Sequence, residues 1–184
     1  LFRSHIANYQ GGKLRNGIPR DASAVIVMTE ENANLLEIYF DSFQEYIKNE
    51  IISYEPDLTM KLEKVDLPET RFARSFQRDF MNAIYACPHG VIAWCEDIPD
   101  LVETSTNLAI VRTINGDQIE VHTSQRSSVD SAKSDISDHI NALFTLAGAG
   151  VKHSDGYPGW NPNKNSTILK ISEKLYKDMF KTQP

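Results

Sequence analysis

The chain has 184 residues, of which 41% are hydrophobic and 24% charged, an ordinary balance for a globular protein with one sizeable core. The formal net charge of -6 repels phosphate backbones, and no apolar run approaches the roughly 18 residues of a membrane span. Composition therefore argues against a nucleic-acid partner and against a membrane.

Only two cysteines occur, Cys87 and Cys95, and their spacing matches no zinc-ribbon motif. We expect reduced thiols in a cytoplasmic protein, with a disulfide as the alternative. The sequence starts at Leu1 without an initiator methionine or a signal peptide, inside what looks like folded sequence. We therefore expect an excised fragment of a longer parent.

The first expected elements are a strand, a helix and a second strand. Ala24 to Met28 is a short apolar run rich in β-branched residues, typical of a buried strand. Thr29 can cap a helix that Pro56 prevents from continuing. The apolar stripe of this helix consists of Leu36, Phe40, Phe43, Ile47 and Ile51. Leu58 to Glu63 alternates apolar and polar residues, as a half-buried strand does.

A helix is expected next from Arg74 to Ala86, ending before Pro88. Leu108 to Ile114 and Gln118 to Ser124 then flank the pair Asn115-Gly116. This pair readily takes the positive φ angles of a type I′ turn, so the two segments are predicted to form a hairpin.

The strand-helix-strand pattern then recurs. A helix follows Arg126, with one apolar face formed by Ala132, Ile136, Ile140, Leu143 and Ala147. Gly148 and Gly150 end it, and Val151 to Ser154 is expected to form a short strand. The offset of roughly 95 residues indicates a divergent internal repeat. Ser166 is expected to cap a last helix with an inward face of Ile168, Ile171, Leu175 and Met179.

These elements predict an α+β fold of two ferredoxin-like halves, with an antiparallel sheet and helices packed on one face. We place the halves at 11–66 and 101–156. A helical segment at 67–100 joins them within a domain spanning 1–156.

The sequence contains no self-contained catalytic apparatus. None of the five histidines, His5, His89, His122, His139 and His153, lies in an HxD, HxH or HExxH arrangement. A GxSxG elbow and a glycine-rich phosphate loop are also absent. We therefore predict no catalytic residue and no metal ligand in this chain.

Two polar residues and one basic segment are candidates for binding. Arg126 ends a strand, so its guanidinium could meet a partner carboxylate, although a surface ion pair or a helix-end contact is the commoner role. Asn107 opens a strand and is most simply a turn residue. The basic segment Lys13 to Arg20 is most simply a solvated loop.

Four blocks of this sequence resemble the aminoacyl-histidine (Xaa-His) dipeptidases. Gly11 to Ala22 looks like that family's GGxLRNAIPREA. His89 to Val91 and Leu101 to Leu108 are similar to NGV…LVETSLNL. Arg126 to Ser131 resembles RSLIDS, and Tyr157 to Pro162 matches YPGWxP. The blocks keep the family's order, and the resemblance runs from about residue 11 to 180.

The resemblance implies a cytoplasmic parent enzyme whose catalytic domain holds two divalent metal ions, zinc being expected. They polarise the scissile carbonyl and activate a water, with a glutamate as general base. The ligands would come from outside this chain. The chain would be the lid and dimerisation domain, and 157–184 the return crossing and first helix of the catalytic domain. Asn107 and Arg126 would bind substrate, Arg126 through the terminal carboxylate of the dipeptide.

Some positions depart from the family pattern. Gly17 stands where alanine is usual and Ala109 where glycine is common. Ser128 and Ala132 replace leucine and glycine near Arg126. The family's lid histidine, in a GGHSG-like block, is expected upstream of Leu1. His5 does not match it.

Alternatives remain open at this point. The domain could be a dimerisation module without substrate contact, giving a homodimer, or its halves could pack together as an internal pseudo-dimer. A ferredoxin-like repeat could also bind a small ligand. The RNA-binding version ranks last, because the aromatic and basic strand signature of RNA binding is missing and the net charge is -6. The expected partners are thus the catalytic domain of the same polypeptide and a dipeptide.

Overall fold

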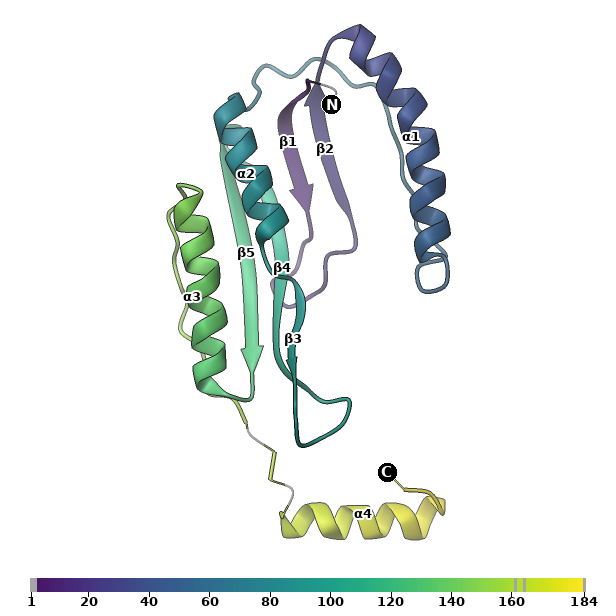
Figure 1. Cartoon of the computed structure of the whole chain (residues 1–184), viewed down its shortest axis with the longest axis vertical. Helices are drawn as coiled ribbons and strands as arrows, with labels where there is room; N and C mark the ends of the chain where they lie inside the picture. Colours follow the sequence, from purple (N-terminus) through teal and green to yellow (C-terminus); the bar gives the residue numbers. More distant parts are fainter. Residues whose placement is uncertain (1–2, 161, 164, 184) are drawn as a thin grey trace.

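The computed structural model describes residues 3–160, 162–163 and 165–183. Asn161 of the YPGWxP block lies outside these described residues. So do the first residue of the predicted domain 1–156 and the last residue of the predicted segment 157–184. Figure 1 shows an elongated antiparallel sheet with α2 (Arg74–Ala86) and α3 (Asp130–Leu146) along one face. Helix α1 (Glu30–Ile51) stands beside the sheet, and α4 (Thr167–Phe180) lies apart from it beyond one end.

The sheet is organised around β4 (Val102–Ile114), which pairs with β5 (Gln118–Ser127) along most of its length. Val111 pairs with β5 and with β1 (His5–Gly11), so β1 lies on the opposite edge of β4. Thr106 likewise pairs with β5 and with β3 (Gly90–Trp94), which places β3 on the same edge as β1. β2 (Ala22–Val27) extends the sheet beyond β1. All pairs are antiparallel.

The predicted hairpin is confirmed. Asn115, Gly116 and Asp117 connect β4 to β5, and Ile114 pairs with Gln118 across them. The φ angles of Asn115 and Gly116 are 52° and 80°. Two positive φ angles in succession belong to a type I′ turn, whose twist matches that of the flanking strands.

The core lies between the sheet and the pair α2 and α3. One cluster joins the two helices to the strands and contains Ala83, Cys87, Ile136, Ile140 and Phe144. A second contains Ile6, Phe72, Phe80 and Val111, and there the ring of Phe80 meets Tyr9 edge to face with centroids 5.6 Å apart. Leu108 and Val121 border both clusters. The α+β class and the antiparallel sheet with helices on one face are confirmed, and the arrangement is compatible with two ferredoxin-like halves.

The two strands expected after the helices of the repeat are wrong. Neither 58–63 nor 151–154 is regular structure. The alternation at Leu58, Met60 and Leu62 reflects packing beside α1, where Met60 and Leu62 share a surface hollow with Phe40. Thr29 caps α1 as predicted, its hydroxyl accepting from the amide of Asn32 at 3.4 Å. The repeat and its boundaries stay predictions.

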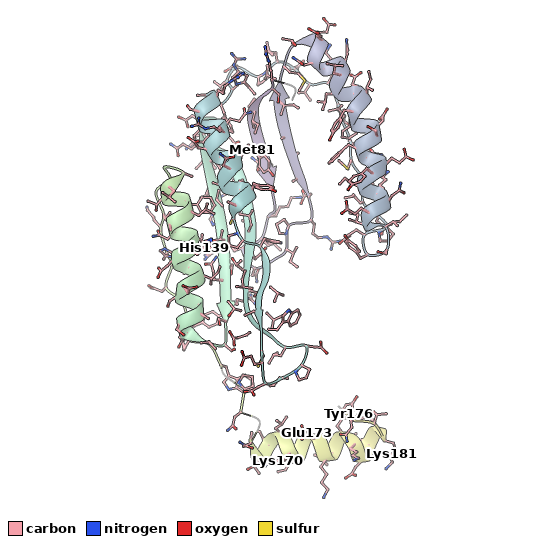
Figure 2. The ribbon with its side chains drawn as sticks, viewed as in Figure 1. Met81, His139, Lys170, Glu173, Tyr176 and Lys181 are labelled. Carbon is pink, nitrogen blue, oxygen red and sulfur yellow. The ribbon has the colours of Figure 1, made fainter. Side chains whose placement is uncertain are left out.

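The inward face expected for the last helix is not buried within the described chain. Ile168, Ile171, Leu175 and Met179 are 70%, 50%, 55% and 72% exposed, and α4 contacts no other described helix or strand. Figure 2 shows α4 with no other element beside it and its side chains projecting on all sides. Ser166 precedes the helix but makes no capping hydrogen bond through its side chain. Among the helices of the described ranges, none combines the length and apolar character needed to cross a membrane.

Candidate functional site

The register of the β4–β5 hairpin brings the two predicted binding residues to the same face. Asn107 pairs with Ser124 and Ser105 pairs with Arg126, and alternation along each strand points these four side chains the same way. Leu108 and Val121 point the other way, into the clusters under α2 and α3. The four residues Ser105, Asn107, Ser124 and Arg126, here called the Asn107 face, therefore lie on the side of the sheet without helices.

Asn107 and Arg126 are diagonal neighbours on this face. Diagonal cross-strand positions lie about 7–8 Å apart, within the combined reach of an amide and a guanidinium. A small ligand could therefore touch both side chains at once.

Arg126 is exposed, and within the described residues no hydrogen bond or ion pair engages its guanidinium. The surface ion pair and the helix-end contact, which composition favours, are thus not observed in the part of the chain that the structure describes. All its donors remain available to a partner outside this structure.

Asn107 lies inside β4 rather than at its start, so the expectation of an ordinary turn residue is wrong. Its side-chain nitrogen donates to the carbonyl oxygen of Gly17 at 2.8 Å. Its side-chain oxygen is buried and finds no partner in the described chain. A buried acceptor left unpaired costs about 1–3 kcal/mol, so the side-chain oxygen of Asn107 lowers the stability of the fold unless a partner binds it.

The basic segment 13–20 is solvated but fastened to the sheet at both ends. Gly12 lies against the backbone of Ala109, and its amide donates to the carbonyl of Asp21 at 3.1 Å. Lys13 forms an exposed ion pair with Asp21 at 2.8 Å. The segment therefore borders the Asn107 face as a closed loop.

The second and third blocks of the resemblance meet along β4 and β5. The hydroxyls of Thr104 and Ser127 lie 2.9 Å apart, and the amide of Ser128 donates to the carbonyl of Glu103 at 3.1 Å. Nδ1 of His89 accepts from the amide of Leu108 at 3.0 Å. This hydrogen bond gives His89 a structural role that the sequence alone does not reveal.

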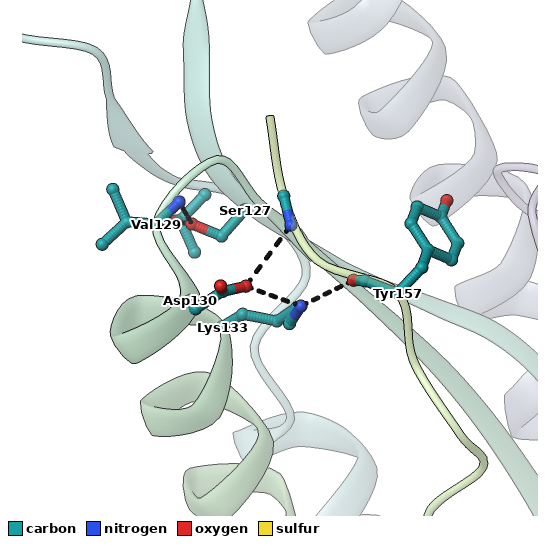
Figure 3. A network of polar contacts seen from close by, with 7 residues as sticks. Ser127, Val129, Asp130, Lys133 and Tyr157 are labelled. Carbon is teal, nitrogen blue, oxygen red and sulfur yellow. Dashed lines mark hydrogen bonds and ion pairs between the residues drawn. The ribbon is translucent and has the colours of Figure 1, made fainter. Parts of the chain in front are cut away.

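The third and fourth blocks meet at the start of α3, as Figure 3 shows. Asp130 accepts from Nζ of Lys133 at 3.0 Å and from the amide of Gly159 at 3.3 Å. Lys133 also donates to the carbonyl of Tyr157 at 2.7 Å. Lys133 and then the Gly159 amide hold the pKa of the Asp130 carboxyl below its ordinary value. These four residues are called the clasp below.

Asp130, Tyr157 and Gly159 belong to the matched blocks and Lys133 follows one of them, yet their spacing in the sequence gives no sign of the contact. Asp130 and Gly159 are separated by 29 positions. Gly159 is required here, since a Cβ would overlap the carbonyl of Ser127 and come within 3.0 Å of Ser128. The one sequence feature that pointed to a close contact at this position was a glycine followed by tryptophan in a segment without regular structure.

Across 3–160, 162–163 and 165–183, no group of three or more His, Cys, Asp or Glu side chains could hold a metal ion. The histidines are dispersed: His5 contacts the carbonyl of Phe72, His122 contacts Glu120, and His153 contacts Ser137. The donor set of the described chain therefore does not fit a two-metal centre. The sequence-based expectation that the ligands lie elsewhere in a parent stays a prediction.

Comparison with known proteins agrees with the motif blocks, although no family model matches the chain. The cytosol non-specific dipeptidase of Escherichia coli K12 is 31% identical over 179 residues, 97% of this chain. The crystal structure of an aminoacylhistidine dipeptidase from Vibrio alginolyticus superposes on all of it with a TM-score of 0.90 and 31% identity. The chain spans about 37% of the length of each. In sequence and in fold, the chain is thus related over its whole length to one segment of these dipeptidases.

Proposed function

We propose that this chain is the lid and substrate-orienting segment of a dipeptidase that hydrolyses Xaa-His dipeptides, with Arg126 binding the C-terminal carboxylate. The observation that carries the proposal is the unengaged, exposed guanidinium of Arg126 beside Asn107 on one face. A dipeptidase must recognise a terminal carboxylate, and the planar fork of arginine does so with two parallel hydrogen bonds.

The arrangement of the C-terminal part supports the same proposal. Beyond the clasp the chain leaves the sheet, and α4 presents an apolar stripe with no described partner. Amphipathic helices gain most of their stability by burying such a stripe. We propose that α4 packs on the catalytic part of the same polypeptide, as the sequence resemblance implies.

The chemistry of hydrolysis belongs, in this proposal, to that other part. When bound there, two divalent metal ions, zinc being the expected metal, would polarise the scissile carbonyl. This chain would contribute binding and orientation only, and we propose that it is inactive alone. The name of the Escherichia coli relative refers to the cytosol, and a cytoplasmic location is proposed here too.

The test compares kcat/KM of the full-length parent on an Xaa-His dipeptide with that of Arg126→Ala. Removing one partner of a desolvated charge pair costs about 2–4 kcal/mol, so we expect a loss of about 30- to 1000-fold. The matched control is Arg74→Ala, because Arg74 is an exposed arginine on α2, on the opposite side of the sheet.

The C-terminal amide of the same dipeptide sharpens the test. It lacks the carboxylate, so wild type should cleave it poorly and Arg126→Ala should discriminate little between acid and amide. If Arg126→Ala and Arg74→Ala lost kcat/KM equally, Arg126 would not belong to the site. The same would follow if Arg126→Ala still discriminated between acid and amide as well as wild type does.

A second candidate is a dimerisation module without substrate contact. It is favoured by β2, which in the described chain pairs only with β1, and by exposed apolar residues on α1 such as Ile38 and Tyr46. An open sheet edge is a template for pairing with another chain. Light scattering on the chain tests this candidate, with twice the monomer mass expected if it is right.

A further inference from the structure

We infer that Asp130 is a positioning residue. Through the clasp it fixes the point at which the chain beyond Gly156, called the crossing below, leaves the sheet. It thereby fixes Arg126 relative to the part of the polypeptide that the crossing enters. The second half of this statement rests on the proposed function, whereas the first half concerns the chain alone. Asp130 touches no reacting group, and its effect is transmitted through backbone contacts.

The clasp fastens the backbone of the crossing rather than its side chains. The Gly159 amide and the Tyr157 carbonyl are the groups held, while the rings of Tyr157 and Trp160 are 78% and 79% exposed. Lys133 links both ends, because its ammonium contacts the Asp130 carboxylate and the Tyr157 carbonyl together. A carboxylate, an ammonium and two backbone groups thus form one connected network.

The network acts directly on the strand that carries Arg126. Gly159 packs so closely on Ser127 and Ser128 that no side chain fits between the backbones. Ser127, the neighbour of Arg126, is itself held by Thr104 and by the amide of Val129, which donates to its hydroxyl at 3.0 Å. The end of β5 is therefore fixed on one side by β4 and on the other by the crossing.

Apart from the close approach of Gly159 to Ser127 and Ser128, no described hydrogen bond replaces the clasp. In the part of the chain that the structure describes, the hydrogen bonds from residues beyond Gly156 to the sheet and its helices end on Asp130 and Lys133. Helix α4 has no buried residue that could hold the crossing by packing. Loss of the carboxylate should therefore release the crossing while leaving the core intact.

The first arm of the test uses the 184-residue chain and amide hydrogen exchange read by NMR. The Gly159 amide should be protected at least tenfold in wild type, and this protection should vanish in Asp130→Ala. Asp138→Ala is the matched control, an exposed aspartate on the same helix, and should leave Gly159 protected. An unprotected Gly159 amide in wild type, or unchanged protection in Asp130→Ala, would refute the clasp.

The second arm uses the full-length parent and a double-mutant cycle. Small displacements remote from the chemistry reduce rates by up to about 100-fold, and we expect Asp130→Ala to lower kcat/KM about tenfold, mainly through KM. In the Arg126→Ala background the same change should have little further effect, because neighbours that act together are not additive. Full additivity would show that Asp130 does not act through Arg126.

The two arms separate the two ideas. An Arg126→Ala parent with normal activity would overturn the proposed function and the functional half of the inference, while exchange at Gly159 would still decide the clasp. Gly159→Ala provides an independent variant, since its Cβ displaces the crossing without altering Asp130. It should reproduce the tenfold loss, and normal kcat/KM and KM with this variant would contradict the inference.

Discussion

Gly12 and Ala109 lie backbone to backbone, although 97 positions separate them in the sequence. Gly12 has a φ of 68°, and a Cβ built on it would overlap the carbonyl oxygen of Ala109. The loop that borders the Asn107 face can approach β4 only because this position carries no side chain.

Gly12→Ala should therefore destabilise the chain by roughly 2–5 kcal/mol. The left-handed conformation contributes about 1–2 kcal/mol and the overlap with Ala109 about 1–3 kcal/mol. Urea unfolding followed by circular dichroism measures the change. Gly116→Ala is the control, because Gly116 has a φ of 80° but open space around it, and should cost only the conformational part, about 1–2 kcal/mol. Equal losses would mean that the contact with Ala109 contributes nothing.

Phe80 is the aromatic centre of one core cluster. It is 7% exposed and packs against Tyr9, Phe72 and Phe76. Phe80→Ala should cost about 3–5 kcal/mol, since the cavity adds to the lost transfer free energy. Tyr85→Ala, on the same helix but 95% exposed, should change stability by less than about 0.5 kcal/mol. A loss below 1 kcal/mol for Phe80→Ala in thermal and urea unfolding would contradict this account of the core.

The two cysteines should differ in reactivity. Both are free thiols, and burial raises the pKa of Cys87 to about 11. Only about one Cys87 in a thousand is therefore a thiolate at pH 8, and the thiolate is the reactive species. Cys95 is only half-buried. With Ellman's reagent we expect one thiol to react quickly in the native chain and a second only in denaturant. Two thiols reacting at equal rates in the native state would contradict the buried position of Cys87.

The clasp should be sensitive to acid. Because the folded pKa of Asp130 is depressed, its stabilising contribution is present above the unfolded value of about 3.9 and is lost as the pH falls through the folded pKa. The Gly159 amide shift should accordingly titrate with a midpoint below that of an ordinary aspartate. Lys133→Met removes the main cause of the depression and should raise the midpoint. A midpoint at or above 3.9 in wild type would be inconsistent with the clasp.

Local sequence patterns predicted those helices and turns that are determined mainly by residues close together in the sequence. The four helices and the Asn115-Gly116 hairpin were predicted from periodicity, caps and turn chemistry. Strand β1 was missed, because its short run includes polar residues and gains its place only from β2 and β4. Leu58 to Leu62 was misassigned, because alternation also arises when an irregular segment packs beside a helix.

The candidate site was likewise predictable only in part: the choice of residues follows from the sequence, and the contacts between distant residues do not. Chemistry and the resemblance point to Arg126 and Asn107, and the register puts them on one face. The bond from Asn107 to Gly17 spans 90 residues and the one from Gly159 to Asp130 spans 29. Such contacts depend on tertiary placement, which single-sequence patterns do not encode.

The position of β4 between two edges has a consequence for the order of folding. The β4–β5 hairpin closes through a three-residue connection, Asn115 to Asp117, and can form within about 1–10 μs. The amide of Tyr9 on β1, by contrast, finds the Thr113 hydroxyl 104 residues away, at a far larger loop-closure entropy. During synthesis β1 and β2 also emerge long before β4, the strand on which β1 pairs, exists. We therefore expect the N-terminal hairpin to join the sheet late and to be the segment most exposed to mispairing until β4 is complete.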